Sequence, residues 1–287
     1  VNSLLGFAFW MVAARLYTSA SVGLGSAALS AMQLLGTIGA LGLGTLLVRE
    51  LPRRPGQRAS LISASLIATG GVSGVLGIGF ALVSPLFSPE FSPLAASVGQ
   101  VVIFGLGSLL NAVTVQLDRA YIGLLRGQLG LWRNTVFAAS KLIILVAVGL
   151  WDRNASGATI YVVWAVSNLL SLLILAPSTL PKGIKWEALK PSWDILHDLR
   201  GAAMGHHVLN LAVYSPDWVL PILATALISA EANAGFYMAM MIGGLLGIAP
   251  AALTSALLAV VSANPQELPG RMRVSLGLSL LSGVLGV

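Results

Sequence analysis

The sequence contains no cysteine and only three histidines among its 287 residues. The lack of cysteine excludes a disulfide framework, a thiol nucleophile, an iron–sulfur cluster and a cysteine-ligated zinc site. His206 and His207 are neighbours and do not share a helix face, and His197 belongs to a polar stretch that precedes them. For these histidines we favour anchoring at a membrane surface over metal binding, and we predict no metal site and no cofactor.

Charged residues are also scarce. They make up 9% of the chain, whereas a soluble domain has roughly 25%. Hydrophobic residues make up 56%, the mean hydropathy is +0.89, and the charges occur in short islands between apolar runs. The net charge of +6 would suggest a nucleic-acid partner in a soluble protein, but this composition leaves too little polar surface for a water-soluble domain. It favours a protein embedded in the lipid bilayer, with no nucleic-acid partner.

Long apolar runs predict an all-α polytopic membrane protein. A membrane helix needs about 20 mostly apolar residues, because the hydrocarbon core is about 30 Å thick. We expect nine such segments: 1–17, 24–48, 60–83, 96–117, 134–151, 159–180, 207–228, 236–262 and 274–287. The first and last are short and the chain begins with Val1, so we expect a fragment of a longer protein. A cleaved signal peptide is the alternative for 1–17, although it lacks a basic region.

Lysine and arginine are unevenly distributed between alternate loops. Thirteen of the 16 follow the second, fourth, sixth or eighth segment. Short cytoplasmic loops accumulate these residues, so we predict that these loops are cytoplasmic and that the short loops between them are external.

The longest polar stretch, Pro181–His206, separates six segments from the other three. Its large apolar residues recur at spacings of 3, 4 and 3: Trp186, Leu189, Trp193 and Leu196. This pattern predicts an amphipathic helix in the inner headgroup layer, which Pro191 breaks or restarts. We expect a first lobe over 1–180, an interfacial linker over 181–206, and the start of a second lobe over 207–287.

A weak internal repeat supports two lobes. A shift of 212 residues places Gly23 on Gly235, and both glycines end a short turn before a Gly/Ala-rich segment. Six segments separate the two turns, so both halves would have the same orientation and would face each other across a central cavity. Chance similarity between apolar helices is the competing explanation.

Several polar residues fall at bilayer depth, where they are costly and usually face a cavity or a partner. Asp217 lies ten residues into its segment, near mid-membrane, and Asn210 and Tyr214 precede it at helical spacing. Pro216 and Pro221 bracket Asp217, a common arrangement at transporter sites. We predict that Asn210, Tyr214 and Asp217 face a substrate cavity. The alternative is a buried Asp217 that bonds a neighbouring helix.

Two cations complete the predicted site. Lys141 lies about 10 Å deep in its segment, where it either faces a cavity or extends toward the headgroups. Arg15 lies near the outer end of the first segment and is either an interfacial anchor or, with Lys141, part of a site for a phosphate-bearing ligand. Asn111, Gln116 and Asn168 could bond sugar hydroxyls, although hydrogen bonds between helices are the favoured use.

Four stretches resemble bacterial polysaccharide and oligosaccharide flippases of the multidrug/oligosaccharidyl-lipid/polysaccharide (MOP) superfamily. They are Ala13–Gly23, Leu41–Gly44 with Arg49–Pro52, Leu117–Arg126 with Leu131–Asn134, and Glu231–Tyr237. The resemblance implies a MATE-like bundle of 12 to 14 helices in two lobes around a cavity, of which three to five helices are missing here. It also implies a multi-pass protein of the bacterial plasma membrane.

The resemblance implies a flippase that moves polyprenyl-pyrophosphate-linked oligosaccharide from the inner to the outer leaflet by alternating access. A membrane potential of about 100 mV, negative inside, favours outward movement of each negative charge by about 2.3 kcal/mol. Our hypothesis is that Arg15 and Lys141 hold the pyrophosphate in turn. Asp217 would couple H⁺ or Na⁺ or help to reset the carrier.

Three other functions compete. A MATE-like exporter of drugs or cations should have a cavity dominated by acidic residues, whereas this chain has two embedded cations against one acid. A membrane-embedded polysaccharide polymerase or glycosyltransferase would need paired carboxylates or a metal site. No such motif occurs, so we do not expect an enzyme. A structural scaffold is disfavoured by the mid-membrane Asp217.

Overall fold

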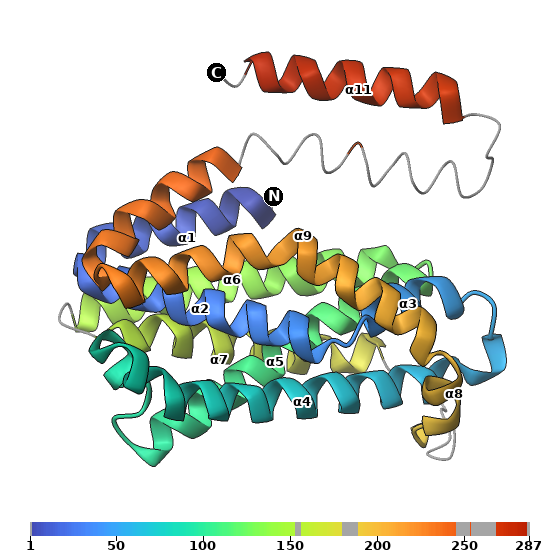
Figure 1. Cartoon of the computed structure of the whole chain (residues 1–287), viewed down its shortest axis with the longest axis horizontal. Coiled ribbons are helices and arrows are strands. Elements are labelled where there is room, and N and C mark those ends of the chain that lie inside the picture. Colours follow the sequence, from blue (N-terminus) through green and yellow to red (C-terminus); the bar gives the residue numbers. More distant parts are fainter. Residues whose placement is uncertain (1, 153–155, 180–188, 245–252, 254–267, 286–287) are drawn as a thin grey trace. The chain divides into compact units, whose positions relative to one another are not determined.

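The computed structural model describes residues 2–152, 156–179, 189–244, 253 and 268–285, and the regular elements in these ranges are all helices (Figure 1). They are α1 (Asn2–Leu16), α2 (Ser19–Gly39), α3 (Leu43–Glu50), η1 (Pro55–Gln57), α4 (Arg58–Phe87), η2 (Pro89–Leu94), α5 (Val98–Gly123), α6 (Gly127–Trp151), α7 (Gly157–Thr179), α8 (Trp193–Asp198), α9 (Arg200–Leu227) and α11 (Leu268–Leu285). Residues 230–244 are helical as well. The predicted all-α class is confirmed.

The chain divides into two compact units, 1–235 and 236–287. The first contains α1 to α9, and the second contains helical residues 236–244 and α11. Residues 181–188 of the predicted linker and most of the segment predicted over 236–262 lie outside the described residues. The predicted division into lobes 1–180 and 207–287 stays a prediction.

Six of the described helices are long and apolar enough to cross a membrane: α2, α4 with η1, α5, α6, α7 up to Pro177, and α9. Two shorter apolar helices, Leu5–Leu16 and Met272–Leu281, match the first and last predicted segments. Several helices extend past the apolar runs that predicted them; α9, for example, begins at Arg200 rather than near residue 207. The difference arises because hydropathy marks only the part of a helix inside hydrocarbon.

The second predicted segment, 24–48, is wrong as a single helix. It is divided into α2 and α3 at Ala40–Gly42, where Leu41 and Gly42 have φ angles of 51° and 73°. Two successive residues in the left-handed region end the regular hydrogen bonding of α2. A side chain at Gly42 would overlap the carbonyl oxygen of Ala203 at the start of α9. The break therefore permits a close contact between α3 and α9 that an unbroken helix would not make.

Helix α2 occupies the middle of the first unit and packs against α4, α5, α7 and α9 (Figure 1). Much of its buried surface consists of glycine, alanine and serine. Small residues let helix backbones approach closely in lipid, where dispersion contacts and interhelical hydrogen bonds hold helices together. The small-residue pattern thus explains why α2, rather than a more hydrophobic helix, lies between four neighbours.

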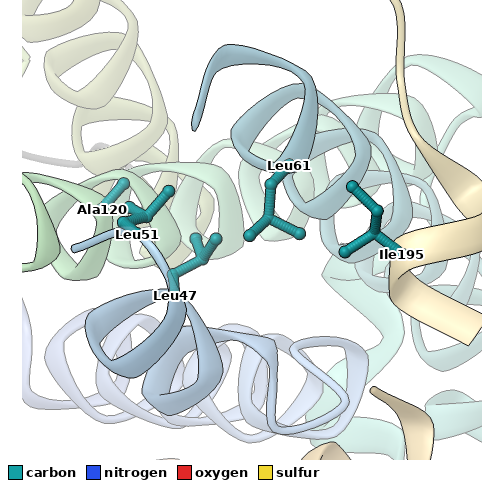
Figure 2. Packing of buried hydrophobic residues seen from close by; sticks show 5 residues of the cluster. All are labelled: Leu47, Leu51, Leu61, Ala120 and Ile195. Atoms are coloured by element: carbon teal, nitrogen blue, oxygen red, sulfur yellow. The ribbon is translucent and has the colours of Figure 1, made fainter. Parts of the chain in front are cut away.

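At the end predicted to be cytoplasmic, α8 docks onto the bundle. Figure 2 shows Ile195 of α8 in one apolar cluster with Leu47 and Leu51 of the α3 end, Leu61 of α4 and Ala120 of α5. Ile195 is buried, whereas Trp193 is about half exposed at 49%. The predicted amphipathic helix is present over Trp193–Asp198. Its buried residue is Ile195, which was not among the predicted apolar positions. Trp186 lies outside the described residues.

At the opposite end, α2 contacts the turn of the helix that begins at Ala230. Asn233 is fully buried and its Nδ2 donates to the Gly23 carbonyl oxygen at 2.9 Å and to Ser26 Oγ at 3.0 Å. Any side chain at Gly23 would overlap the Ala230 carbonyl oxygen. This outer contact between Gly23, Ser26, Ala230 and Asn233 joins residues more than 200 positions apart in the sequence.

Candidate functional site

A cavity of about 260 Å³ lies between α2, α3, α5 and α9 in the first unit. Its polar lining comes from Gln33 and Thr37 on α2, Thr45 on α3, Asn111, Gln116 and Arg119 on α5, and Asn210 and Tyr214 on α9. Glycine and alanine residues on α2, α3 and α5 provide much of the remaining wall, together with Trp218. Small residues on three helices leave open the space that larger side chains would fill.

The lining is rich in neutral hydrogen-bonding groups. It contains four amide side chains, three hydroxyl groups and one cation, Arg119, and the lining residues that the structure describes include no aspartate or glutamate. Ligand pockets use polar side chains of these kinds to orient the ligand and to select it. A lining of amides, hydroxyl groups and one arginine suits a ligand with many hydroxyl groups or with negative charge better than it suits a cation.

Two hydrogen bonds across the cavity wall hold amide side chains in place. Asn111 Nδ2 donates to Gln33 Oε1 at 2.9 Å, and so joins α5 to α2. Asn210 Nδ2 approaches Thr45 Oγ1 at 3.5 Å, the outer limit of a hydrogen bond, between α9 and α3. Each amide keeps an oxygen that can accept a further hydrogen bond.

Of the predicted residues on α9, Asn210 and Tyr214 line the cavity, and the described lining continues with Trp218 rather than Asp217. Asp217 is exposed in the first unit. The cavity is therefore lined by Asn210, Tyr214 and Trp218, which are spaced by four residues. Side chains with this spacing form a row that is inclined to the helix axis. Helical spacing alone could not show that Trp218, rather than Asp217, faces the cavity.

Lys141 lies in a cage of aromatic rings. Its Nζ is 4.2 Å from the ring centroid of Trp164, 4.9 Å from that of Phe137 and 5.0 Å from that of Phe9. The side chain is only 4% exposed. The rings come from α1, α6 and α7, and the faces of aromatic rings attract cations. Lys141 thus connects three helices through its ammonium group and is not among the described residues that line the cavity.

Arg15 is exposed in the last turn of α1. Neither Arg15 nor Lys141 lines the cavity between α2, α3, α5 and α9. The structure therefore does not bring the two predicted cations together with Asn210 and Tyr214, because Lys141 is directed toward rings on α1 and α7. The described residues also include no group of three His, Asp or Glu side chains that could hold a metal ion.

Sequence reasoning did not include Arg119 or Trp218 among the site residues, and for Gln116 it favoured a hydrogen bond between helices over contact with a sugar. Arg119 was assigned to a cytoplasmic loop, but α5 continues to Gly123 and places Arg119 on its last turns. Ala112, Gln116 and Arg119 are spaced at i, i+4 and i+7, which places them on one helix face once the helix extends to Arg119. The apolar run predicted over 96–117 ends before Arg119, and therefore did not place Arg119 on this helix.

No family model and no curated protein matches the sequence. Among solved structures, the fold is similar to that of a multidrug resistance MATE family transporter of the MOP superfamily in an inward-facing conformation. The TM-score is 0.68 at 15% sequence identity, over 98% of this chain and 68% of that chain.

This chain therefore shares the fold of that transporter. At 15% identity the likeness concerns the fold alone, and it confirms the predicted MATE-like helical bundle. With the membrane-length helices described above, it supports a multi-pass membrane protein.

Proposed function

We propose that the chain is part of a transporter that moves a lipid-linked oligosaccharide from the inner to the outer leaflet of a bacterial plasma membrane by alternating access. The observation that carries the proposal is the composition of the cavity. Amide, hydroxyl and aromatic side chains surround it with one arginine and, among the described lining residues, no carboxylate.

The lining matches the chemistry of this cargo. Sugar hydroxyl groups both donate and accept hydrogen bonds, as do the amides of Gln33, Asn111 and Asn210. Tyr214 and Trp218 offer ring faces against which the apolar faces of a sugar can pack. Arg119 supplies the positive charge that a phosphate group requires.

The predicted residues have different parts in this proposal. Asn210 and Tyr214 contact the sugar, and Asp217 couples H⁺ or Na⁺ movement or helps to reset the carrier. Arg15 and Lys141 lie on α1 and α6, outside the cavity of this conformation. For Arg15 to hold a pyrophosphate, α1 has to move relative to the cavity, and for Lys141 the ammonium group has to leave the rings of Phe9, Phe137 and Trp164.

A MATE-like exporter of drugs is the second candidate. It is favoured by the similarity of the fold to a multidrug resistance MATE transporter. Export of a cation would require carboxylates from residues that do not line the described cavity.

The decisive experiment compares two cargoes with the full-length protein in liposomes. One preparation receives a fluorescent polyprenyl-pyrophosphate sugar and the other receives a cationic dye. We expect translocation of the sugar lipid only. Transport of the dye without transport of the sugar lipid would refute the proposed function and support the second candidate.

A pair of tryptophan variants connects transport to the cavity. Trp218→Leu removes a ring from the cavity wall and should lower the transport rate severalfold. Trp151→Leu removes a ring that is 94% exposed at the end of α6 and should leave the rate unchanged. Equal rates in the two variants would contradict binding of the sugar in this cavity.

A further inference from the structure

Gln116 and Arg119 lie on one face of α5, three residues apart, and both line the cavity. Gln116 is only 1% exposed, and its Nε2 has no hydrogen-bond partner within the described part of the chain. A buried donor without an acceptor is costly. A ligand that enters the cavity with an acceptor atom would remove that cost.

Arg119 carries a positive charge that its neighbour in the sequence does not neutralise. Asp118 is paired with Arg133 of α6: Arg133 Nε donates to Asp118 Oδ1 at 2.8 Å and Arg133 Nη2 to Asp118 Oδ2 at 2.6 Å. Asn134 Nδ2 also donates to Asp118 Oδ2, at 2.9 Å. The ion pairs found among the described residues do not include Arg119, whose side chain is exposed.

A glycine on the opposite wall leaves room for both side chains. A Cβ atom at Gly44 of α3 would lie 3.2 Å from Arg119 Cγ and 3.2 Å from Gln116 Oε1. These distances are tighter than ordinary van der Waals contacts. A side chain at this position would push the stem of Arg119 and the amide of Gln116 a few tenths of an ångström away from α3.

The position along the membrane fits an anionic headgroup. Arg119 lies four residues before the end of α5, or about 6 Å from the end predicted to be cytoplasmic. With the predicted orientation, Arg119 is expected near the inner-leaflet headgroups, which carry phosphate. The sugar-compatible lining of Gln33, Asn210 and Tyr214 lies on neighbouring helices around the same cavity.

We propose that Gln116 and Arg119 form a subsite for a phosphate or pyrophosphate oxyanion at the cytoplasmic mouth of the cavity. The guanidinium of Arg119 and the Nε2 of Gln116 donate to phosphate oxygens, while Asp118 is retained by Arg133. The inference rests on the proposed function, since the oxyanion is taken to be the headgroup of the lipid-linked cargo.

Binding to the detergent-solubilised full-length protein tests the subsite. The probes are geranylgeranyl pyrophosphate, inorganic pyrophosphate and the neutral alcohol geranylgeraniol, followed by isothermal titration calorimetry. We expect saturable binding of geranylgeranyl pyrophosphate that weakens with salt, and no comparable binding of the alcohol. Comparable binding of inorganic pyrophosphate would identify a site for free anions, whereas its failure to bind would identify a site for lipid headgroups.

Variants separate the subsite from surface charge. Arg119→Gln should weaken binding of geranylgeranyl pyrophosphate at least tenfold, because hydrogen bonds from a charged donor are lost. Arg126→Gln, the matched control, makes the same change of net charge at an exposed position outside this cavity and should alter binding less than twofold. Equal weakening in both variants would overturn the proposal.

Gln116→Leu should weaken binding about threefold or more, through loss of one neutral donor. Because Gln116 Nε2 has no partner within the described residues, this variant should keep the thermal midpoint of the wild-type protein. A clear fall in the midpoint with unchanged binding would show that Gln116 supports the fold instead, and would overturn the subsite. Gln116→Glu places a carboxylate beside Arg119 and should abolish binding of the pyrophosphate.

The subsite and the proposed function can fail separately. If pyrophosphate binding depends on Arg119 and Gln116 but liposomes do not translocate sugar lipid, the proposed function fails and the subsite stands. If sugar lipid is translocated at the wild-type rate by Arg119→Gln and Gln116→Leu, the subsite is wrong and the function stands.

Discussion

The outer contact between α2 and the helix that begins at Ala230 can be opened by a single methyl group. In Gly23→Ala, the added carbon would lie 2.5 Å from the Ala230 carbonyl carbon and 3.1 Å from Ala230 Cα, and would overlap the carbonyl oxygen. Ordinary contacts between such atoms are about 3.5–4.0 Å. The two helices therefore have to separate at this point.

The free-energy cost of Gly23→Ala can be worked out from the contacts that are broken when the two helices separate. Asn233 Nδ2 loses its bonds to the Gly23 carbonyl and to Ser26 Oγ, and a net intramolecular hydrogen bond contributes about 0.5–1.5 kcal/mol. Overpacking costs about 1–3 kcal/mol, and the higher helix propensity of alanine offsets about 0.8–1 kcal/mol. We expect Gly23→Ala to destabilise the closed outer contact by about 1–5 kcal/mol.

A cysteine reporter can detect the opening, because the sequence has no cysteine of its own. Ser30 of α2 is 1% exposed and its Oγ has no partner among the described residues, so Ser30→Cys should cause little disturbance. In this background, Gly23→Ala should increase the rate at which a membrane-impermeant maleimide labels the cysteine from outside. The thermal midpoint should fall as well.

Gly79→Ala on α4 is the matched control, since an added Cβ there would meet no atom within 4 Å. It should change neither labelling nor thermal stability, apart from a small gain in helix propensity. If Gly23→Ala labels no faster than Gly79→Ala and is equally stable, the reasoning about a closed outer contact is refuted.

Three further substitutions test the packing. Gly42→Ala, which forces alanine to a φ of 73° against the Ala203 carbonyl, should lower stability by about 1–3 kcal/mol in thermal unfolding; an unchanged midpoint would mean that the α2–α3 break relaxes easily. Asp118→Leu leaves Arg133 buried without its anion and should cost about 3–5 kcal/mol, seen as loss of monodisperse protein in size-exclusion chromatography, with partial recovery when Arg133→Met is added. Lys141→Met should keep the wild-type midpoint, because methionine fills the ring cage without a buried charge, whereas Lys141→Ala should lower it by about 2–5 kcal/mol through a cavity; equal losses would show that the charge itself holds α1, α6 and α7 together.

The helical membrane architecture was predictable from the sequence alone. Hydropathy and the distribution of Lys and Arg are properties of short stretches of chain, and the bilayer acts on each stretch separately. The ranges 60–83, 96–117 and 159–180 therefore correspond closely to α4, α5 and α7. Asn210 and Tyr214 could be assigned to one helix face for the same local reason.

Only the tertiary structure decided which helices meet and where their polar side chains go. The break at Leu41–Gly42 serves a contact with α9, more than 150 residues away, and no local pattern specifies that contact. Lys141 is directed into rings from α1 and α7, while Arg119 lines the cavity because α5 continues beyond its apolar run. The direction of a side chain depends on the neighbour that its helix packs against, and in a helical membrane protein that neighbour is chosen by close-range shape and hydrogen bonding rather than by hydropathy.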